Sequence, residues 1–149
     1  MEIALLNSSL EPFMTIKASD LTCWSISRAD GAAAEPLRRQ TIDYSAATHQ
    51  GSSGSRLFWG PYIGLQAGVY LFQFDGRVEG MLMVDFVCQR GNRQLKAARL
   101  TDFSNPVCLV VTRQVEDLEV RGATTKTLRS LTLKLIEVHR AFVDRSPVR

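Results

Sequence analysis

Apolar residues recur at every second position along most of this chain, and that period constrains the fold more than any other feature. In the segment 68–75, Tyr70, Phe72 and Phe74 fall on one side of an extended chain, and the residues between them fall on the other. Successive side chains of a β-strand point to opposite faces of a sheet, whereas an α-helix repeats every 3.6 residues. The pattern therefore predicts strands with one face turned to a core.

Further segments share this alternation or are rich in β-branched and aromatic residues: 13–17, 21–27, 81–88, 107–113, 118–121 and 131–138. In the last of them the alternation shifts by one residue, which predicts a β-bulge near Leu135. Turn-forming pairs such as Asp75-Gly76 and Glu79-Gly80 separate the segments at intervals of roughly 10–14 residues, the spacing of an all-β sandwich or barrel. No segment predicts a capped amphipathic helix of two or more turns.

We therefore predict one all-β domain over residues 1–149, an antiparallel β-sandwich of about eight or nine strands. A length of 149 residues, with 45% apolar and 22% charged residues, is ordinary for one globular domain. Residues 29–56 are expected to form a long polar loop, with a short strand at 40–44, and residues 144–149 a frayed tail. No apolar run approaches the roughly 20 residues that span a bilayer, so no membrane span is predicted.

The charge pattern and the cysteines limit the class of partner. A net charge of +3 comes from 18 basic and 15 acidic residues without blocks of like charge, which indicates no nucleic-acid partner. The three cysteines lack metal-binding spacing, and the first residues lack the pattern of a signal peptide. We expect a cytoplasmic protein with reduced thiols, no metal and no cofactor.

Catalytic motifs are absent from the sequence. Its two histidines, His49 and His139, lie in no recognised nucleophile or metalloprotease motif, and Glu116 and Asp117 are neighbours in the chain rather than carboxyls facing across a cleft. The glycines match neither a P-loop nor a dinucleotide-binding fingerprint. We therefore predict a binding protein rather than an enzyme, with no catalytic residues.

The most distinctive segment runs from Arg56 to Phe74. An aromatic strand, a Gly-Pro break and a second aromatic strand form a corner with Trp59 and Tyr62 near its bend. Flat aromatic rings stack on the apolar faces of sugars while nearby polar side chains bind the hydroxyls. Strand alternation places Phe58 and Trp59 on opposite faces, however, so one of the two belongs to the core.

The run Phe58-Trp-Gly-Pro-Tyr-Ile-x-Leu-x-x-Gly-x-Tyr-x-x-x-Phe74, followed by Gly80-x-Leu-x-Val-Asp85, resembles a known family. It is similar to jelly-roll β-sandwich domains of the carbohydrate-binding-module or galactose-binding-like type, which accompany bacterial glycosyltransferases and enzymes of polysaccharide synthesis. The resemblance covers roughly residues 50–140 and implies a jelly-roll fold. The chain departs from the pattern at Trp59, where that family usually has a small residue or none. Some relatives hold a structural calcium, for which Asp20 and Glu137 alone are too few ligands.

Two functional hypotheses follow. The first is a non-catalytic module that binds a glycan or glycoconjugate through Tyr44, His49, Arg56, Trp59 and Tyr62. The aromatic side chains would stack on sugar rings, and Arg56 and His49 would hydrogen-bond to hydroxyl or carboxylate groups. The alternative is a protein-interaction module without a sugar site, either a homo-oligomer or the partner of a polysaccharide-modifying enzyme. It is suggested by the apolar segments 81–88 and 107–111.

Overall fold

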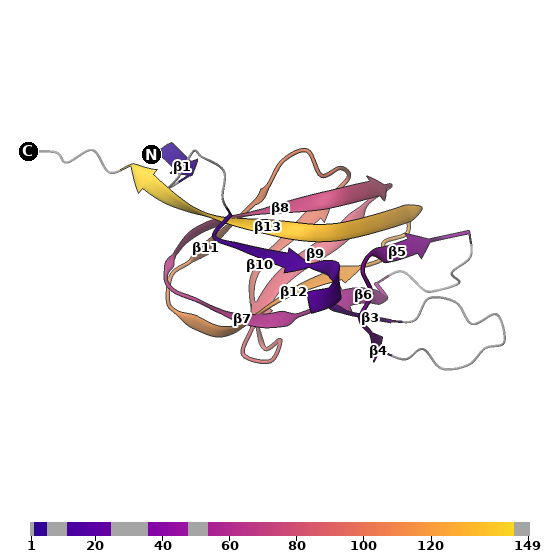
Figure 1. Ribbon diagram of the computed structural model, residues 1–149, viewed down its shortest axis with the longest axis horizontal. Coiled ribbons are helices and arrows are strands. Elements are labelled where there is room, and N and C mark those ends of the chain that lie inside the picture. The colour runs from indigo at the N-terminus through magenta and orange to yellow at the C-terminus, as the bar shows by residue number, and fades with distance from the viewer. Residues whose placement is uncertain (1, 6–11, 25–35, 48–53, 145–149) are drawn as a thin grey trace, which may run out of the picture.

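The computed structural model describes residues 2–5, 12–24, 36–47 and 54–144. Over these ranges the chain forms two antiparallel β-sheets packed as two layers (Figure 1), and its helical content is the single 3-10 turn η1 (Ala18–Asp20). The prediction of an all-β sandwich is confirmed. The described residues contain no helix with the length and apolar character needed to cross a membrane.

The first sheet has six strands and is built around the longest of them, β13 (Ser130–Asp144). One edge of β13 pairs with β8 (Gly68–Glu79), which pairs in turn with the edge strand β11 (Val107–Val111). The other edge pairs with three short strands in succession: β5 (Ile42–Ser45), β2 (Met14–Lys17) and β1 (Glu2–Leu5).

The second sheet has seven strands, with β12 (Val115–Ala123) near its centre. On one side of β12 lie β9 (Leu82–Cys88) and then the edge strand β10 (Arg93–Leu100). Its other side pairs with two short strands, β7 (Pro61–Leu65) and β6 (Arg56–Trp59). Beyond β6 the sheet continues through β3 (Thr22–Trp24) to β4 (Pro36–Leu37).

The strand order is that of a jelly roll. The first sheet runs β2, β13, β8, β11, and the second runs β6, β12, β9, β10, with the chain crossing between the sheets from β8 to β9 and from β10 to β11. Two interlocked Greek keys produce this order. The described residues contain thirteen strands rather than eight or nine, because short consecutive strands share one edge of β13 and one edge of β12.

The core lies between the sheets and follows the predicted alternation. Tyr70, Phe72 and Phe74 of β8 are all buried, while the residues between them are only partly so. The Phe72 ring meets that of Phe86 from the opposite sheet edge-on, with 4.8 Å between ring centres. Such pairs add to the hydrophobic stabilisation that burial of the rings provides. The inward face of β8 is therefore packed directly against β9.

The β-bulge predicted near Leu135 is present. It also explains why the turn predicted at Asp75-Gly76 does not form. The pairing of β13 with β8 shifts between Leu133 and Leu135. Opposite this shift, Gly76 continues β8 instead of ending it. Its φ is +148°, and a Cβ on it would overlap the carbonyl oxygen of Thr132, so glycine is needed for close approach of the two strands.

Three other predictions are corrected or limited. The segment 29–56, predicted as a loop, contains β4 as well as β5, which confirms the short strand expected at 40–44. Within that segment, residues 29–35 and 48–53 lie outside the described residues. The predicted tail, 145–149, also lies outside them. Strand β10 was not predicted, because its Arg-Gln-Leu-Lys-Ala-Ala-Arg-Leu sequence does not alternate regularly between apolar and polar residues. Its pairing with β9 shifts register between Gln94 and Lys96.

Candidate functional site

Strand β6 presents Arg56 and Trp59 on the outer face of the seven-stranded sheet. Its Phe58 points inward, is 0% exposed and lies opposite Gly122 of β12. The Phe58 ring occupies the space that a Cβ on residue 122 would need, so the two strands can pair closely only because that residue is glycine. By alternation Trp59 then faces outward, where it is partly exposed. The prediction that Phe58 and Trp59 face opposite sides is confirmed.

The Gly-Pro break turns β6 into β7 and brings Tyr62 beside the same strand. Gly60 has a φ of +116°, and its carbonyl oxygen accepts a hydrogen bond of 2.7 Å from the backbone N–H of Val120. Both short strands therefore pair with β12, and the predicted corner lies against that strand. Tyr62 itself adopts a φ of +70° and is 52% exposed.

Arg56 stacks on Trp59. Its guanidinium carbon lies 5.9 Å from the centre of the indole ring, within the range of a cation–π contact. Arg56 is exposed and takes part in none of the ion pairs among the described residues. The indole thus holds a charged hydrogen-bond donor at the surface without neutralising it.

Tyr62 donates a hydrogen bond of 3.2 Å to the carboxylate of Glu119 on β12. Glu119 is only 5% exposed. Burial, followed by the negative charge of Glu119 and the hydrogen bond to it, raises the pKa of the Tyr62 hydroxyl above its usual value near 10. At neutral pH the phenol therefore keeps its proton and remains a donor to Glu119.

Arg121 and Asp85 form a bidentate pair between β12 and β9. The Arg121 Nε donates to Asp85 Oδ1 at 2.8 Å and its Nη2 donates to Oδ2 at 2.5 Å. Both side chains are mostly shielded from water, at 22% and 18% exposed. The hydrogen bonds to Asp85 raise the pKa of Arg121, and the nearby Glu119 carboxylate adds to this effect.

These six residues form one group on the outer face of the seven-stranded sheet, which we call the outer-face cluster: Arg56, Trp59, Tyr62, Asp85, Glu119 and Arg121. It combines two accessible aromatic rings with guanidinium donors and carboxylate acceptors. Most of its polar groups are held by side chains from other strands. Such cross-strand support fixes the positions of groups that contact a ligand before the ligand arrives.

Three of the five residues predicted from the sequence, Arg56, Trp59 and Tyr62, belong to this cluster. Tyr44 does not: it is 7% exposed and points from β5 of the other sheet into the core, opposite Leu131. His49 lies outside the described residues.

Sequence reasoning missed Asp85, Glu119 and Arg121, although each is a charged residue in a segment predicted to be a strand. Asp85 alternates with the inward Val84 and Phe86, which is the signal that could have placed it on an outer face. The sequence carries no local sign that β9 pairs with β12.

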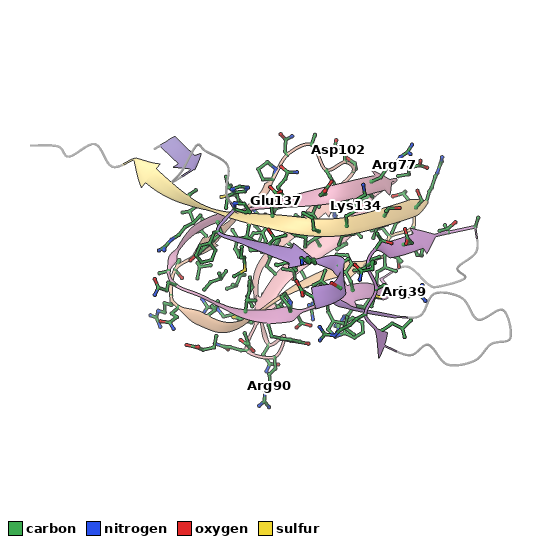
Figure 2. All side chains as sticks on the ribbon, in the orientation of Figure 1. Arg39, Arg77, Arg90, Asp102, Lys134 and Glu137 are labelled. Carbon is green, nitrogen blue, oxygen red and sulfur yellow. The ribbon has the colours of Figure 1, made fainter. Side chains whose placement is uncertain are left out.

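A hollow lies at the end of the sandwich near the turn after β8. Its volume is about 670 Å³, and its lining includes Glu79, Lys126, Thr127 and Arg129. Charged side chains also project elsewhere, including Lys134 of β13 (Figure 2). Among the described residues there is no group of three or more His, Cys, Asp or Glu side chains placed to hold a metal ion.

Comparison of the chain with models of protein families, with curated proteins and with solved structures gives no match. The chemistry of the outer-face cluster is therefore the basis of the functional proposal. Two aromatic rings at a surface, together with charged donors and acceptors in fixed positions, suit a ligand that is partly apolar and rich in hydroxyl groups.

Proposed function

We propose that this chain is a non-catalytic module that binds a carbohydrate or glycoconjugate on the outer face of its seven-stranded sheet. The observation that carries this proposal is the outer-face cluster, in which Trp59 and Tyr62 lie beside paired charged groups. A sugar ring has an apolar C–H face, which packs on an aromatic ring, and a rim of hydroxyls, which exchange hydrogen bonds with charged side chains.

Each member of the cluster has a distinct part in this proposal. The Trp59 and Tyr62 rings stack on sugar faces, and Tyr62 is accessible enough to do so while its hydroxyl stays bound to Glu119. Arg56 donates hydrogen bonds to ring substituents. Asp85 holds the Arg121 guanidinium in position on the outer face through two hydrogen bonds. No step of bond breaking is assigned to any of these residues.

The test is a glycan array with the purified chain, followed by titration of the best saccharide against three variants. Trp59→Ala and Tyr62→Ala should each lower the affinity roughly tenfold, because each removes one stacking surface. Phe13→Ala is the matched control, because Phe13 is an exposed aromatic residue, at 48%, that packs near Tyr70 of the other sheet. Equal affinities for all three variants in folded proteins would reject the site.

Tryptophan fluorescence gives an independent reading of the same binding. A sugar that stacks on Trp59 should change its emission, and the change should disappear in Trp59→Phe while the second tryptophan, Trp24, is retained. Binding that leaves the Trp59 emission unaltered would place the ligand elsewhere on the chain.

A second candidate function, self-assembly, is favoured by the edge strand β11. Among the described residues β11 pairs only with β8, its five residues are all apolar, and Val110 is 56% exposed. An apolar edge without charges or bulges is a template for pairing with another strand. The occupant that fits is a second copy of the chain, with two β11 edges antiparallel about a two-fold axis.

Mass in solution tests this second candidate. A dimer that becomes a monomer in Val110→Lys would support it, because a charge on an exposed edge opposes strand pairing. A monomer at the highest accessible concentration would reject it and would leave the saccharide proposal intact.

We also propose that the chain acts in the cytoplasm with its cysteines reduced. The support is that Cys23 and Cys88 are buried free thiols in the core rather than parts of a disulfide. Burial raises the pKa of Cys23, so its reactive thiolate form is disfavoured at neutral pH. Thiol titration should show that Cys23 and Cys88 react slowly in the folded protein and fast after unfolding, whereas Cys108 is only partly buried.

A further inference from the structure

A second arginine lies in the same cross-strand row as Arg56. In the register of the seven-stranded sheet, Ala123 pairs with Arg56 on one side and with Met83 on the other. Met83 pairs in turn with Arg99 of the edge strand β10. The pairing of β12 with β6 shifts register between Gly122 and Ala123, which places Arg56 on the face opposite Phe58. Residues that pair directly across strands share a face, so these four form one row on the outer face. We call it the arginine row.

Both ends of the arginine row carry unneutralised charge. Arg56 and Arg99 are exposed, and neither belongs to an ion pair among the described residues. The acidic groups beside the row are already engaged, since Asp85 is bound to Arg121 and Glu119 accepts the Tyr62 hydrogen bond. A ligand on this face therefore meets two positive charges that have no protein counter-ion within the described chain.

The length of the row limits the size of the ligand. Between β6 and β10 lie two strands, so the backbones at its ends are separated by three strand spacings, or about 14 Å. The residues between the arginines are Met83 and Ala123, which are uncharged and leave the middle of the row open to an apolar sugar face. A single sugar cannot reach both arginines, whereas an oligosaccharide laid across the strands can.

We propose that the outer face selects acidic oligosaccharides, with carboxylates on separate sugar residues bound by Arg56 and Arg99. The planar guanidinium fork matches the two oxygens of a carboxylate and binds them through parallel hydrogen bonds. The sugar whose carboxylate reaches Arg56 lies over Trp59, so charge and stacking act on the same residue of the ligand. This inference rests on the proposed carbohydrate-binding function and adds the charge, minimum length and direction of the ligand.

The experiment uses matched ligands that differ only in charge. Oligosaccharides of glucuronate and of galacturonate are each titrated beside the same oligosaccharide after its carboxylates have been reduced to alcohols. The acidic forms should bind roughly a hundredfold more tightly than the reduced forms if two charge-assisted contacts are made. The preference should shrink as salt is raised, because both arginines are exposed. The corresponding monosaccharides should bind weakly.

Three variants each remove one positive charge. Arg56→Gln and Arg99→Gln should each lower the affinity for the acidic oligosaccharide roughly tenfold and change that for the reduced form little. Arg113→Gln is the control, because Arg113 is also exposed and follows β11 of the other sheet. It should leave both affinities nearly unchanged. Thermal unfolding of each variant verifies that the fold is kept.

The possible outcomes separate this inference from the function on which it rests. Equal binding of acidic and reduced oligosaccharides would overturn the inference and leave a carbohydrate-binding module. A preference for acidic ligands that Arg113→Gln weakens as much as Arg99→Gln would overturn the arginine row. If a single-stranded oligonucleotide bound as tightly as the acidic oligosaccharide, the preference would be general charge attraction, and the inference would again be overturned. No binding to any saccharide would reject both proposals.

Discussion

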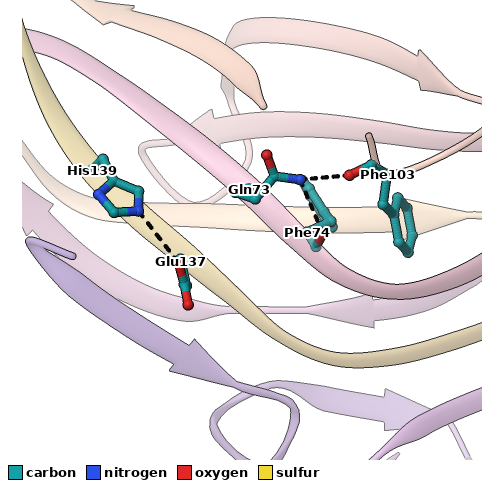
Figure 3. A network of polar contacts seen from close by, with 5 residues as sticks. All are labelled: Gln73, Phe74, Phe103, Glu137 and His139. Carbon is teal, nitrogen blue, oxygen red and sulfur yellow. Dashed lines mark hydrogen bonds and ion pairs between the residues drawn. The ribbon is translucent and has the colours of Figure 1, made fainter. Parts of the chain in front are cut away.

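The two outer faces of the sandwich arrange their charged pairs in different ways. On the seven-stranded sheet, Arg121 bonds to Asp85 of a neighbouring strand, and Glu119 accepts from Tyr62 of a third. On the six-stranded sheet, His139 contacts Glu137 at 3.3 Å, two residues away on the same strand (Figure 3).

Gln73 of the six-stranded sheet likewise bonds to backbone rather than to another side chain. Its Nε2 donates to the carbonyl oxygens of Phe103, at 2.6 Å, and Phe74, at 3.2 Å (Figure 3). These contacts secure a loop and a strand. The six-stranded sheet also joins side chains of two strands where the Thr132 hydroxyl donates to Asp43 at 3.1 Å. On the seven-stranded sheet the side chains held across strands include a bidentate ion pair, which is the arrangement that a preorganised binding surface requires.

On the seven-stranded sheet the largest effect is expected from Gly122→Ala, which disrupts the packing of the core beneath the outer-face cluster. A Cβ at this position would overlap the Phe58 ring, which is fully buried, so the free energy of unfolding should fall by about 3 kcal/mol. Urea unfolding measures the change. Gly64→Ala is the control in the same sheet, because its Cβ would make only ordinary contacts, the nearest at 3.6 Å from the Val115 carbonyl oxygen.

A double variant sharpens this prediction. Phe58→Leu should relieve part of the loss caused by Gly122→Ala, because a smaller side chain leaves room for the new methyl group. It should not relieve Gly76→Ala in the six-stranded sheet, where the obstacle is the Thr132 backbone. If Phe58→Leu relieved Gly122→Ala and Gly76→Ala equally, the Phe58 ring would not be the specific obstacle at position 122.

The next largest effect compares the polar pairs of the two faces. Arg121→Leu leaves Asp85 and the buried Glu119 without their cation, and should lower the free energy of unfolding by about 2 kcal/mol. The matched change on the six-stranded sheet, His139→Gln, removes a contact within one strand and should cost about 1 kcal/mol, because the His139 side chain is 14% exposed. Similar losses of unfolding free energy in both variants would show that pairing across strands stabilises the fold no more than a contact within one strand.

A smaller effect is expected from Tyr62→Phe, which keeps the ring and removes only the hydrogen bond to Glu119. We expect a loss of about 0.5–1 kcal/mol, because a nearly buried carboxylate loses one donor. The raised pKa of Tyr62 means that its contribution is fully present below pH about 10 and is lost as pH rises through the higher folded value. The stability difference between the two proteins should therefore stay constant from neutral pH to about pH 9.

The sequence predicts what depends on neighbours along the chain. Alternation identified the inward aromatic residues of β8, the opposite orientation of Phe58 and Trp59, and the irregularity near Leu135. These features depend only on the period of two. Tyr44 shows the limit of such reasoning, since a four-residue strand alternates without revealing which of its faces meets the core.

The partners of the candidate site could not be predicted in the same way. Asp85 and Arg121 are 36 positions apart, and their contact depends on the pairing of β9 with β12. The arginine row spans four strands and requires the register of three pairings. No local pattern encodes these registers, because they are set by how the whole jelly roll closes around its core.

The smallest effect concerns two aspartates, Asp117 and Asp102. Asp117 contacts a distant segment of the chain, and Asp102 contacts a near neighbour in its own loop. Asp117 of β12 accepts hydrogen bonds of 2.9 Å from the backbone N–H groups of Gln89 and Arg90, which have φ values of +55° and +57° in the turn between β9 and β10. Asp102 accepts from the backbone N–H and the hydroxyl of Ser104, two residues away. These hydrogen bonds lower the pKa of both carboxyls.

Asp117→Ala should therefore lower the melting temperature slightly, and more than Asp102→Ala, because it releases a turn of two left-handed residues from the sheet. A lowered folded pKa means that the stabilising contribution of Asp117 is present above the unfolded value near 3.9 and disappears as pH falls through the folded value. Melting curves of wild type and Asp117→Ala should differ at pH 7 and converge at acid pH. A difference that persists below the folded pKa would show that the side chain acts by packing rather than by its charge.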